Sequence, residues 1–257
     1  MSGLFIPFAS LAYHGLTVLE IAPHEFRTSN PTLVELRNAL AACPKLRYLA
    51  LIECWFETDS RVPIKPVLLL GLEILDLRMT ADDEELVAVM SCIDSGPNEL
   101  AFSVSLDPDM SEDAMASLLR FIRQSNVTRL CIDSTLEDGL ADLDWLLGLP
   151  QGETLAIREL ALCTYYFREG TSFKQPLSAD RLPFLHTLHL MKWERLDVRI
   201  CRQVLETSAV QVLRFDEPQC GTVQEMTKVA PFIEPCRFSP GVSYTEGNLE
   251  WPLYVYL

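Results

Sequence analysis

Apolar residues recur along this chain in a six-residue pattern that is apolar at its first, fourth and sixth positions. Full copies are LTVLEI (16–21), LRYLAL (46–51), LEILDL (72–77), VTRLCI (127–132), IRELAL (157–162), LHTLHL (185–190) and VQVLRF (210–215), and a degenerate copy is ELAFSV (99–104). Successive copies begin 25 to 30 residues apart. Apolar residues two positions apart are typical of a strand that buries one side. The pattern therefore predicts about eight short strands in a repeat structure.

Two of the segments between these strands have the apolar spacing of an amphipathic helix. Positions i, i+3, i+4 and i+7 hold Leu86, Val89, Met90 and Ile93 in 82–93, and Met115, Leu118, Leu119 and Ile122 in 111–122. Signals for the start of a helix are Asn30 before Pro31, Thr80 with Asp83 three residues later, and Ser111 before Glu112 and Asp113. Each repeat is therefore expected to contain a strand, a turn and a returning helix.

A strand–helix unit of this length cannot bury its own apolar face, so such units must stack on one another. The expected fold is an α/β solenoid of about eight repeats, with a concave parallel sheet and convex helices. We expect one domain over 1–257, with an N-terminal cap (1–14), repeats (15–217) and a C-terminal cap (218–257) that covers the last repeat. The expected core includes Leu49, Leu51, Leu75, Leu77, Leu130, Leu160, Leu162, Leu188, Leu190 and Leu213.

The strand pattern, the repeat length and the intervening helices together resemble the leucine-rich repeat family over residues 15–217. CPKLRYLAL (43–51), in which a helix ends at Cys-Pro before the leucine strand, is similar to the repeat region of F-box/leucine-rich repeat proteins, particularly fungal ones. In that family an N-terminal F-box docks on a ubiquitin-ligase adaptor and the repeats hold the substrate. No F-box is recognisable in this sequence, so the resemblance implies only the binding role.

The eight cysteines are widely spaced, without a Cys-x-x-Cys pair or a Cys/His cluster. Structural zinc sites need closely spaced ligand pairs, so we expect no metal. Free thiols buried as small apolar side chains are the favoured interpretation, and they agree with a cytoplasmic or nuclear protein. The resemblance implies that Cys54, three residues after Leu51, belongs to the repeat core, as does Cys43.

The net charge of −15 disfavours a nucleic-acid or acidic-membrane partner, because phosphate contacts need clustered Lys and Arg. The most apolar run (67–77) contains Glu73 and Asp76 and is shorter than the roughly 20 residues of a membrane span. The acidic residues at 82–85 are expected to be solvated in a first helical turn. His186 and His189 lie three apart on a predicted strand, hence on opposite faces, which disfavours a shared metal. No catalytic motif is present, and we expect neither an enzyme nor a cofactor.

These features favour a non-enzymatic module that binds another protein. Two alternatives stay open: the substrate-recognition part of an F-box-type ubiquitin-ligase receptor whose F-box is missing or diverged, and a hydrolase on a repeat scaffold. The expected binding residues on the concave face alternate with the strand leucines and are Tyr48, Asp76, Arg78, Arg129, Asp133, Glu159, His189 and Arg214. The alternative for this face is that opposite charges, such as Arg129 and Glu159, pair with each other across adjacent strands.

A second expected binding region follows the strand at 157–162, where a long segment lacks a helical stripe. Residues 165–202 hold seven Lys and Arg against four acidic residues, although the whole chain is acidic. Aromatic and arginine side chains are enriched in binding hot spots. The candidates are Tyr166, Phe167, Arg168, Phe173 and Trp193. The alternative is that these aromatic residues fold under their own loop.

Overall fold

The computed structural model describes residues 10–22, 31–57, 65–78, 83–106, 110–134, 146, 153–164, 182–191, 210–216 and 233–236. The chain divides into two compact units, Met1–Thr128 and Arg129–Leu257. Each unit contains parallel strands. Among the described residues, the helices lie in the first unit, apart from a single helical residue at position 146. The protein is therefore an α/β protein, as predicted. The prediction of one repeat domain with caps at 1–14 and 218–257 stays a prediction.

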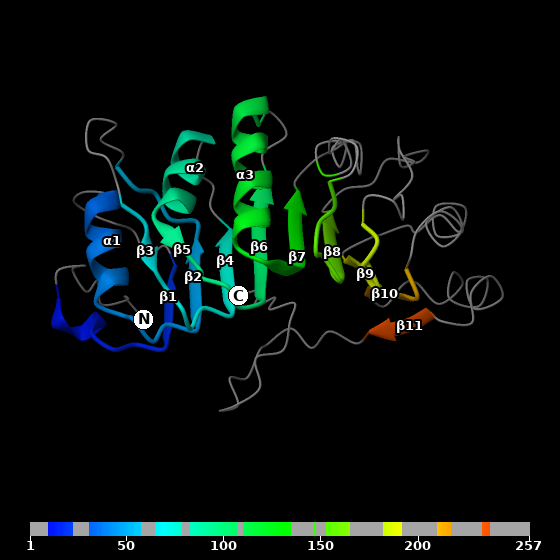
Figure 1. Cartoon of the computed structure of the whole chain (residues 1–257), viewed down its shortest axis with the longest axis horizontal. Helices are drawn as coiled ribbons and strands as arrows, with labels where there is room; N and C mark the ends of the chain where they lie inside the picture. Colours follow the sequence, from blue (N-terminus) through cyan, green and yellow to red (C-terminus); the bar gives the residue numbers. More distant parts are fainter. Residues whose placement is uncertain are drawn as a thin grey trace. The chain divides into compact units, whose positions relative to one another are not determined.

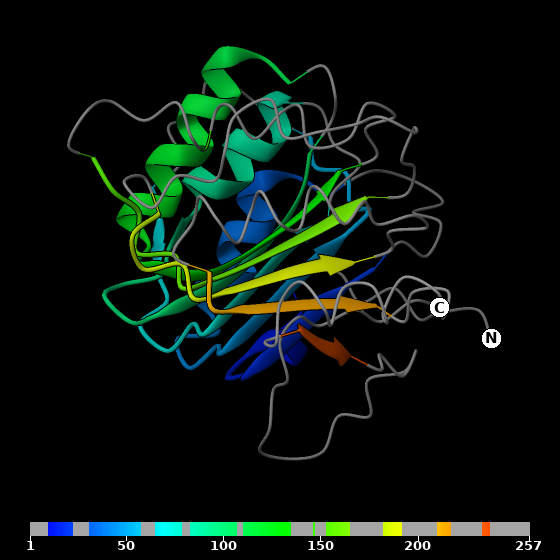
Figure 2. The same ribbon diagram turned by 90° about the vertical axis from the view of Figure 1, so that its right-hand side faces the viewer.

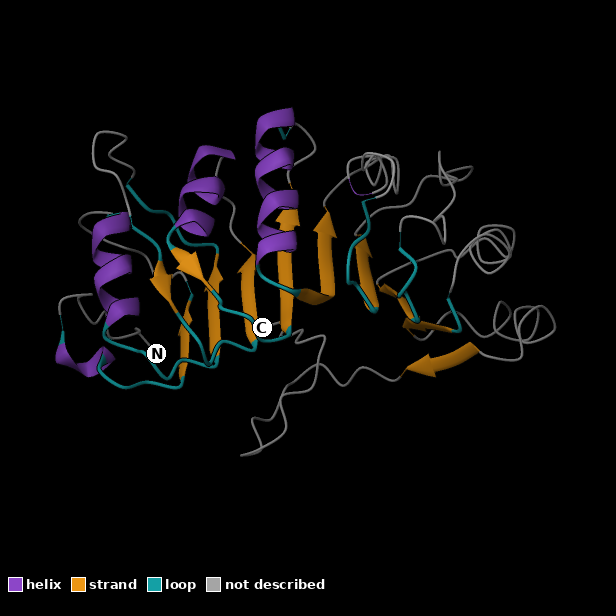
Figure 3. Ribbon diagram, in the orientation of Figure 1, coloured by secondary structure: helices purple, strands orange, loops and turns teal. Residues whose placement is uncertain are grey.

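In the first unit, four parallel strands lie in the order in which they occur along the chain (Figure 1). They are β1 (Val18–Ile21), β2 (Tyr48–Ile52), β4 (Ile74–Arg78) and β6 (Leu100–Leu106). Helices α1 (Leu33–Ala41), α2 (Asp83–Ser91) and α3 (Glu112–Gln124) return the chain between strands and stand side by side on one face of them (Figures 1 and 3). A short 3-10 helix, η1 (Leu11–Tyr13), precedes β1. Two-residue strands β3 (Val67–Leu68) and β5 (Ile93–Asp94) form a separate parallel pair.

The second unit holds most of β7 (Val127–Ser134), followed by β8 (Glu159–Thr164), β9 (Thr187–Met191), β10 (Val212–Asp216) and β11 (Ile233–Cys236). These strands are also parallel and adjacent in chain order. Figure 2 shows β9 (yellow) and β10 (orange) running side by side in one direction. Every one of the eight predicted segments contains a strand, which confirms this prediction. β11 was not predicted.

A repeated hydrogen-bond pattern joins the start of each strand to the start of the next. The carbonyl oxygen of Thr17 accepts from the N–H groups of Arg47 (2.8 Å) and Tyr48 (3.2 Å). One repeat later, the carbonyl oxygen of Arg47 accepts from Glu73 (2.9 Å) and Ile74 (3.0 Å). The second unit has the same arrangement at Arg158 with His186 and Thr187, and at His186 with Gln211 and Val212. Equivalent positions of the sequence pattern thus make equivalent backbone contacts, which fixes the register.

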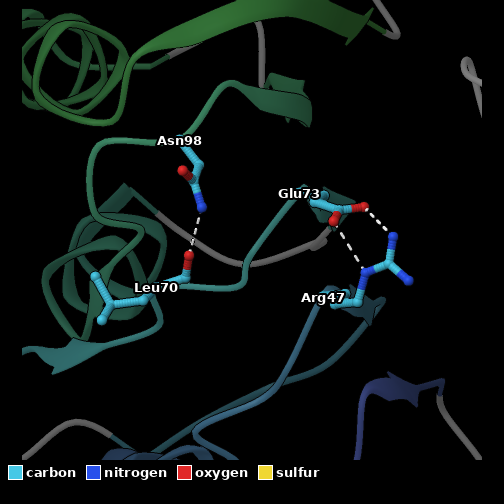
Figure 4. A network of polar contacts seen from close by, with 4 residues as sticks. All are labelled: Arg47, Leu70, Glu73 and Asn98. Carbon is cyan, nitrogen blue, oxygen red and sulfur yellow. Dashed lines mark hydrogen bonds and ion pairs between the residues drawn. The ribbon is translucent and has the colours of Figure 1, made fainter.

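Side chains reinforce these joints in the first unit (Figure 4). Arg47 donates through Nε and Nη2 to the two carboxylate oxygens of Glu73, at 2.9 and 2.8 Å. Asn98 donates its side-chain amide to the carbonyl oxygen of Leu70 at 2.6 Å (Figure 4). Asn126, one repeat later, donates in the same way to Pro97 at 3.1 Å. Asn126 has a φ of +46°, a left-handed conformation that asparagine tolerates better than most residues.

The strand leucines form the core against the helices. The rings of Phe102 on β6 and Phe121 on α3 lie 5.2 Å apart, so the face of the strands that carries Phe102 packs towards α3. Phe102 is in register with Leu75, which is in register with Leu49. The predicted core residues Leu49, Leu51, Leu75, Leu77, Leu130, Leu160, Leu162, Leu188 and Leu213 are all buried. Their burial is confirmed, whereas the side chain of Leu190 lies outside the described residues.

The helices differ from the prediction in three places. α1 is capped by Thr32, which forms a capping box with Glu35, and Asn30 lies outside the described residues. α3 begins after Ser111 as predicted, but its buried side chains are Ala114, Leu118, Phe121 and Ile122. The predicted stripe was wrong at Met115 and Leu119, which are only half-buried, and Phe121, which packs against Phe102, is buried instead.

The third difference concerns the connection between β2 and β4. The described residues between β2 and β4 contain the strand β3, where the repeat pattern predicts a helix. Pro66 directly precedes β3, and proline lacks the backbone N–H group that a helix needs. In α2 the predicted Leu86, Val89 and Met90 are buried, and Ile93 is buried in β5 beyond the end of the helix. Thr80 lies outside the described residues.

The first turn of α2 corrects the expectation that its acidic residues are solvated. Glu84 is exposed, but Glu85 is only 5% exposed. The Oε1 atom of Glu85 accepts a hydrogen bond from the backbone N–H group of Phe56. Glu85 therefore fastens the segment after β2 to α2. Asp83 also has a structural role, because its Oδ2 atom accepts from the N–H group of Ser111 at 2.6 Å.

Truncation of a core leucine tests the packing. Leu75→Ala is expected to lower the free energy of unfolding by about 2–5 kcal/mol, because Leu75 is fully buried and its removal leaves a cavity. The matched control is Leu68→Ala in β3, which is 52% exposed and should change stability by less than about 0.5 kcal/mol. Urea denaturation of both variants measures the difference. Equal effects would contradict the core described above.

The neighbouring residues Glu84 and Glu85 offer a second matched pair. Glu85→Ala leaves the Phe56 N–H group without its acceptor and is expected to destabilise the protein by about 1–3 kcal/mol. Glu84→Ala removes an exposed carboxylate from the same helical turn and should have a much smaller effect. Thermal and urea denaturation give both values. If Glu84→Ala proves the more damaging substitution, the assignment of Glu85 as an anchor is wrong.

Candidate functional site

Between the core leucines, side chains of alternate positions lie on the opposite face of each strand, which we call the polar strand face. In the first unit its members include Glu20, Tyr48, Ala50, Asp76, Arg78 and Ser103. In the second unit they include Arg129, Cys131, Asp133, Glu159, Ala161, Cys163, Thr187, His189 and Arg214. Since these residues alternate with the core positions, they face away from the leucine core.

The polar strand face of the first unit is organised by an ion pair within β4. Arg78 donates through Nη2 to Oδ2 of Asp76 at 2.6 Å, and its Nε lies 3.0 Å from both carboxylate oxygens. Asp76 is only 1% exposed, so the arginine supplies the charge that a buried carboxylate needs. Tyr48 is also buried. Burial raises the pKa of its hydroxyl most, and the negative charges of Asp76 and Glu20 raise it further. Asp76 thus serves here as a partner of Arg78.

The polar strand face of the second unit is organised around Glu159. Arg129 is in register with Glu159 on the neighbouring strand, and His189 is in register with Arg214. The Nε2 atom of His189 lies 3.5 Å from Oε2 of Glu159. The contact with His189 lowers the pKa of Glu159. Burial opposes this effect, and the electrostatic influence of His189, Arg129 and Arg214 lowers the pKa further. Four strands therefore contribute to one charged cluster of Arg129, Glu159, His189 and Arg214, which we call the Glu159 cluster.

The predicted binding residues of the strands fall into two groups. Tyr48, Asp76, Asp133 and His189 are buried, and Arg78, Arg129, Glu159 and Arg214 are half-buried. The structure brings together Asp76 with Arg78, and the four members of the Glu159 cluster. The alternative interpretation, in which opposite charges on adjacent strands pair, describes these contacts well. Tyr166, Phe167, Arg168, Phe173 and Trp193 lie outside the described residues, and the binding role of both groups stays a prediction.

His186 directly precedes β9, and His189 lies within it. His186 is exposed, whereas His189 is 2% exposed on the polar strand face. Within the described ranges, no group of three or more His, Cys, Asp or Glu side chains is arranged to hold a metal ion. None of the helices in that part of the chain has the length and apolar character needed to cross a bilayer.

Buried thiols support the strand ends. Cys43, Cys54, Cys92, Cys131 and Cys163 are all free and buried, which confirms the prediction for these five. The Sγ atom of Cys54 donates to the carbonyl oxygens of Ile21 (3.2 Å) and Ile52 (3.3 Å), and thus joins β1 to β2. Burial raises the pKa of Cys54 to about 12. Cys54 therefore stays a neutral thiol that satisfies backbone carbonyl groups, and it is not a reactive nucleophile.

Trp55 and Phe184 are exposed aromatic residues that were missed in the sequence. Trp55 directly follows Cys54 and is 47% exposed. The strand period did not indicate this exposure, because position 55 is in phase with Leu49 and Leu51 and would be buried if the strand continued. In the structure Glu53 and Glu57 are exposed as well, while Cys54 and Phe56 are buried.

The pH dependence of stability tests the Glu159 cluster. Because the folded state lowers the pKa of Glu159, its ionised form stabilises the fold above the pKa of an unfolded glutamate, about 4.3. This contribution is lost as the pH falls through the lower, folded pKa. Glu159→Gln should therefore be less stable than wild type at pH 7, and the difference should shrink below pH 4. A stability difference that is constant between pH 3 and pH 7 would contradict the cluster.

Comparison with protein-family models gives no match, and comparison with curated protein sequences gives none either.

Proposed function

We propose that this protein is a non-enzymatic, leucine-rich-repeat type of module that binds another protein through its polar strand face. The observation that carries the proposal is the Glu159 cluster, in which charged side chains from adjacent strands are held in register. Side chains fixed in this way lose little conformational freedom when a partner binds, which favours affinity.

The regular backbone supports the repeat part of the proposal. Strand starts at Arg47, Glu73, His186 and Gln211 bond to the preceding repeat in the same way. Turns before three strands are also alike, because Leu46, Leu72 and Leu185 each donate their N–H group to the carbonyl oxygen three residues earlier. A solenoid of stacked repeats, with a concave sheet, is the arrangement that best accounts for such equivalent contacts.

The composition of the polar strand face supports a protein partner. Arg129, Glu159 and Arg214 are half-buried, so part of each side chain remains at the surface. The signs are mixed, which suits a partner with both charges better than a polyanion. The five free thiols support an intracellular location as part of this proposal.

Charge reversal in the Glu159 cluster tests the proposed surface. Arg129→Glu should reduce recovery of specifically bound proteins from a cell extract by at least about tenfold, because it reverses one charge of the recognition surface. Arg120→Glu on α3 makes the same change at an exposed position outside the polar strand face and should leave recovery unchanged. Quantitative mass spectrometry of material bound to the immobilised full chain measures both.

Two controls complete this experiment. Arg129→Gln removes the charge without placing two carboxylates opposite each other, and thermal denaturation checks that every variant is folded. Equal recovery with wild type and all three variants would contradict the proposed surface. Recovery of a ubiquitin-ligase adaptor with the wild type would favour the receptor alternative over a simple binding module.

A further inference from the structure

Trp55 is presented to solvent by a segment that is otherwise tightly packed. The segment Glu53–Glu57 follows β2, and exposure alternates along it. Cys54 is fully buried and Phe56 is 5% exposed, whereas Trp55 is 47% exposed. A large exposed tryptophan surface is costly in water, and such side chains are enriched in binding hot spots. The two neighbours of Trp55 are therefore buried, while its indole remains partly exposed to solvent.

Hydrogen bonds to four other parts of the first unit hold this segment in place. The N–H group of Glu53 donates to Arg78 at 2.7 Å, and the thiol of Cys54 donates to Ile21. The N–H group of Phe56 donates to Glu85. Glu57 donates to the carbonyl oxygen of Pro31 at 2.9 Å and accepts from Leu33 at 3.2 Å. The backbone that carries the indole is therefore held in place before any ligand arrives.

The backbone at Glu53 supports a specific local role. Glu53 has a φ of +48°, in the left-handed region that glycine and asparagine favour. A glutamate in this conformation costs free energy, and such positions persist where the surrounding structure imposes them. This turn redirects the chain at the end of β2, where it exposes Glu53 and Trp55 and buries Cys54 between them.

Exposed carboxylates lie close to Trp55 along the chain. Glu53 and Glu57 are exposed on either side of it along the chain, and Glu84 is exposed in the turn of α2 that Glu85 binds to this segment. The negative charges of Glu85 and Glu53 both act on Cys54 and add to the effect of its burial. A tryptophan ring attracts a cation through its electron-rich face, and nearby carboxylates strengthen that attraction.

We propose that Trp55, Glu53 and Glu57 form a binding site for a lysine- or arginine-rich segment of a partner protein. A guanidinium or ammonium group stacks on the indole of Trp55, and neighbouring basic side chains pair with Glu53 and Glu57. The net charge of −15 assists the approach of such a segment. This site is separate from the polar strand face and depends on the proposed function only in that the partner is a protein.

A labelled hexa-arginine peptide is the probe, and its fluorescence anisotropy with the full chain at about 0.15 M salt gives the Kd. Trp55→Ala is expected to raise the Kd about tenfold, because the stacking surface is lost. Trp55→Phe keeps a ring with a weaker attraction for cations and should raise it less. Since Trp55 is half exposed, both variants should keep the wild-type thermal stability. A Trp55→Ala protein that binds the peptide as tightly as wild type would overturn the proposal.

Paired charge variants separate this site from attraction to the whole acidic surface. The Glu53→Gln, Glu57→Gln double variant should raise the Kd at least about fivefold more than the Glu112→Gln, Asp113→Asn double variant, which removes two exposed charges at the start of α3. Equal losses would mean attraction by net charge alone and would overturn the proposal. Arg129→Glu should bind the peptide as well as wild type, so failure here is distinguishable from failure of the proposed polar strand face.

Discussion

The structure depends on hydrogen bonds that join the start of each strand to the start of the preceding one. A strand of four to eight residues leaves its backbone N–H and C=O groups unpaired, and buried polar groups of this kind must find partners. Here the N–H groups of Glu73 and Ile74 share the carbonyl oxygen of Arg47, and the N–H group of Arg47 donates to the carbonyl oxygen of Thr17. Thr17, Arg47, Arg158 and His186 each supply such an acceptor for the following strand, so these joints fix the register of β2, β4, β9 and β10.

The same register determines both faces of the strands. A shift by one residue would exchange the leucines for the polar side chains, so burial of Leu49 and Leu75 also sets the position of Asp76. In the second unit, alignment of Leu130 with Leu160 places Arg129 opposite Glu159. The charged clusters are therefore a consequence of the core packing. Their ion pairs offset the cost of placing charge next to a buried sheet.

The parts of the fold that the sequence predicted are those governed by local periodicity. All eight strands and the burial of their leucines follow from apolar residues at fixed spacing, and Ser111 marked the start of α3 correctly. β11 could not be found in this way, because Ile-Glu-Pro-Cys lacks the leucine pattern. It is identified as a strand by its pairing with β10.

Tertiary contacts explain the remaining differences. Glu85 looks like an ordinary first-turn acid in the sequence, and only the approach of the Phe56 N–H group shows that it is buried. The charge pairing at Asp76 was missed because Arg78, two residues away, was read as a separate surface residue, although both lie on one face of β4. Trp55 lies just beyond the strand pattern, so its exposure depends on where the chain turns at Glu53.

The most direct test of this account is a measurement of methyl–methyl nuclear Overhauser effects between strands in the full chain. The parallel register predicts strong cross-peaks for Leu49 with Leu75 and for Leu51 with Leu77. In the second unit it predicts them for Leu130 with Leu160 and for Ile132 with Leu162. Antiparallel strands would instead pair Leu49 with Leu77 and Leu51 with Leu75. Dominance of those crossed pairs would contradict the parallel register of the strands.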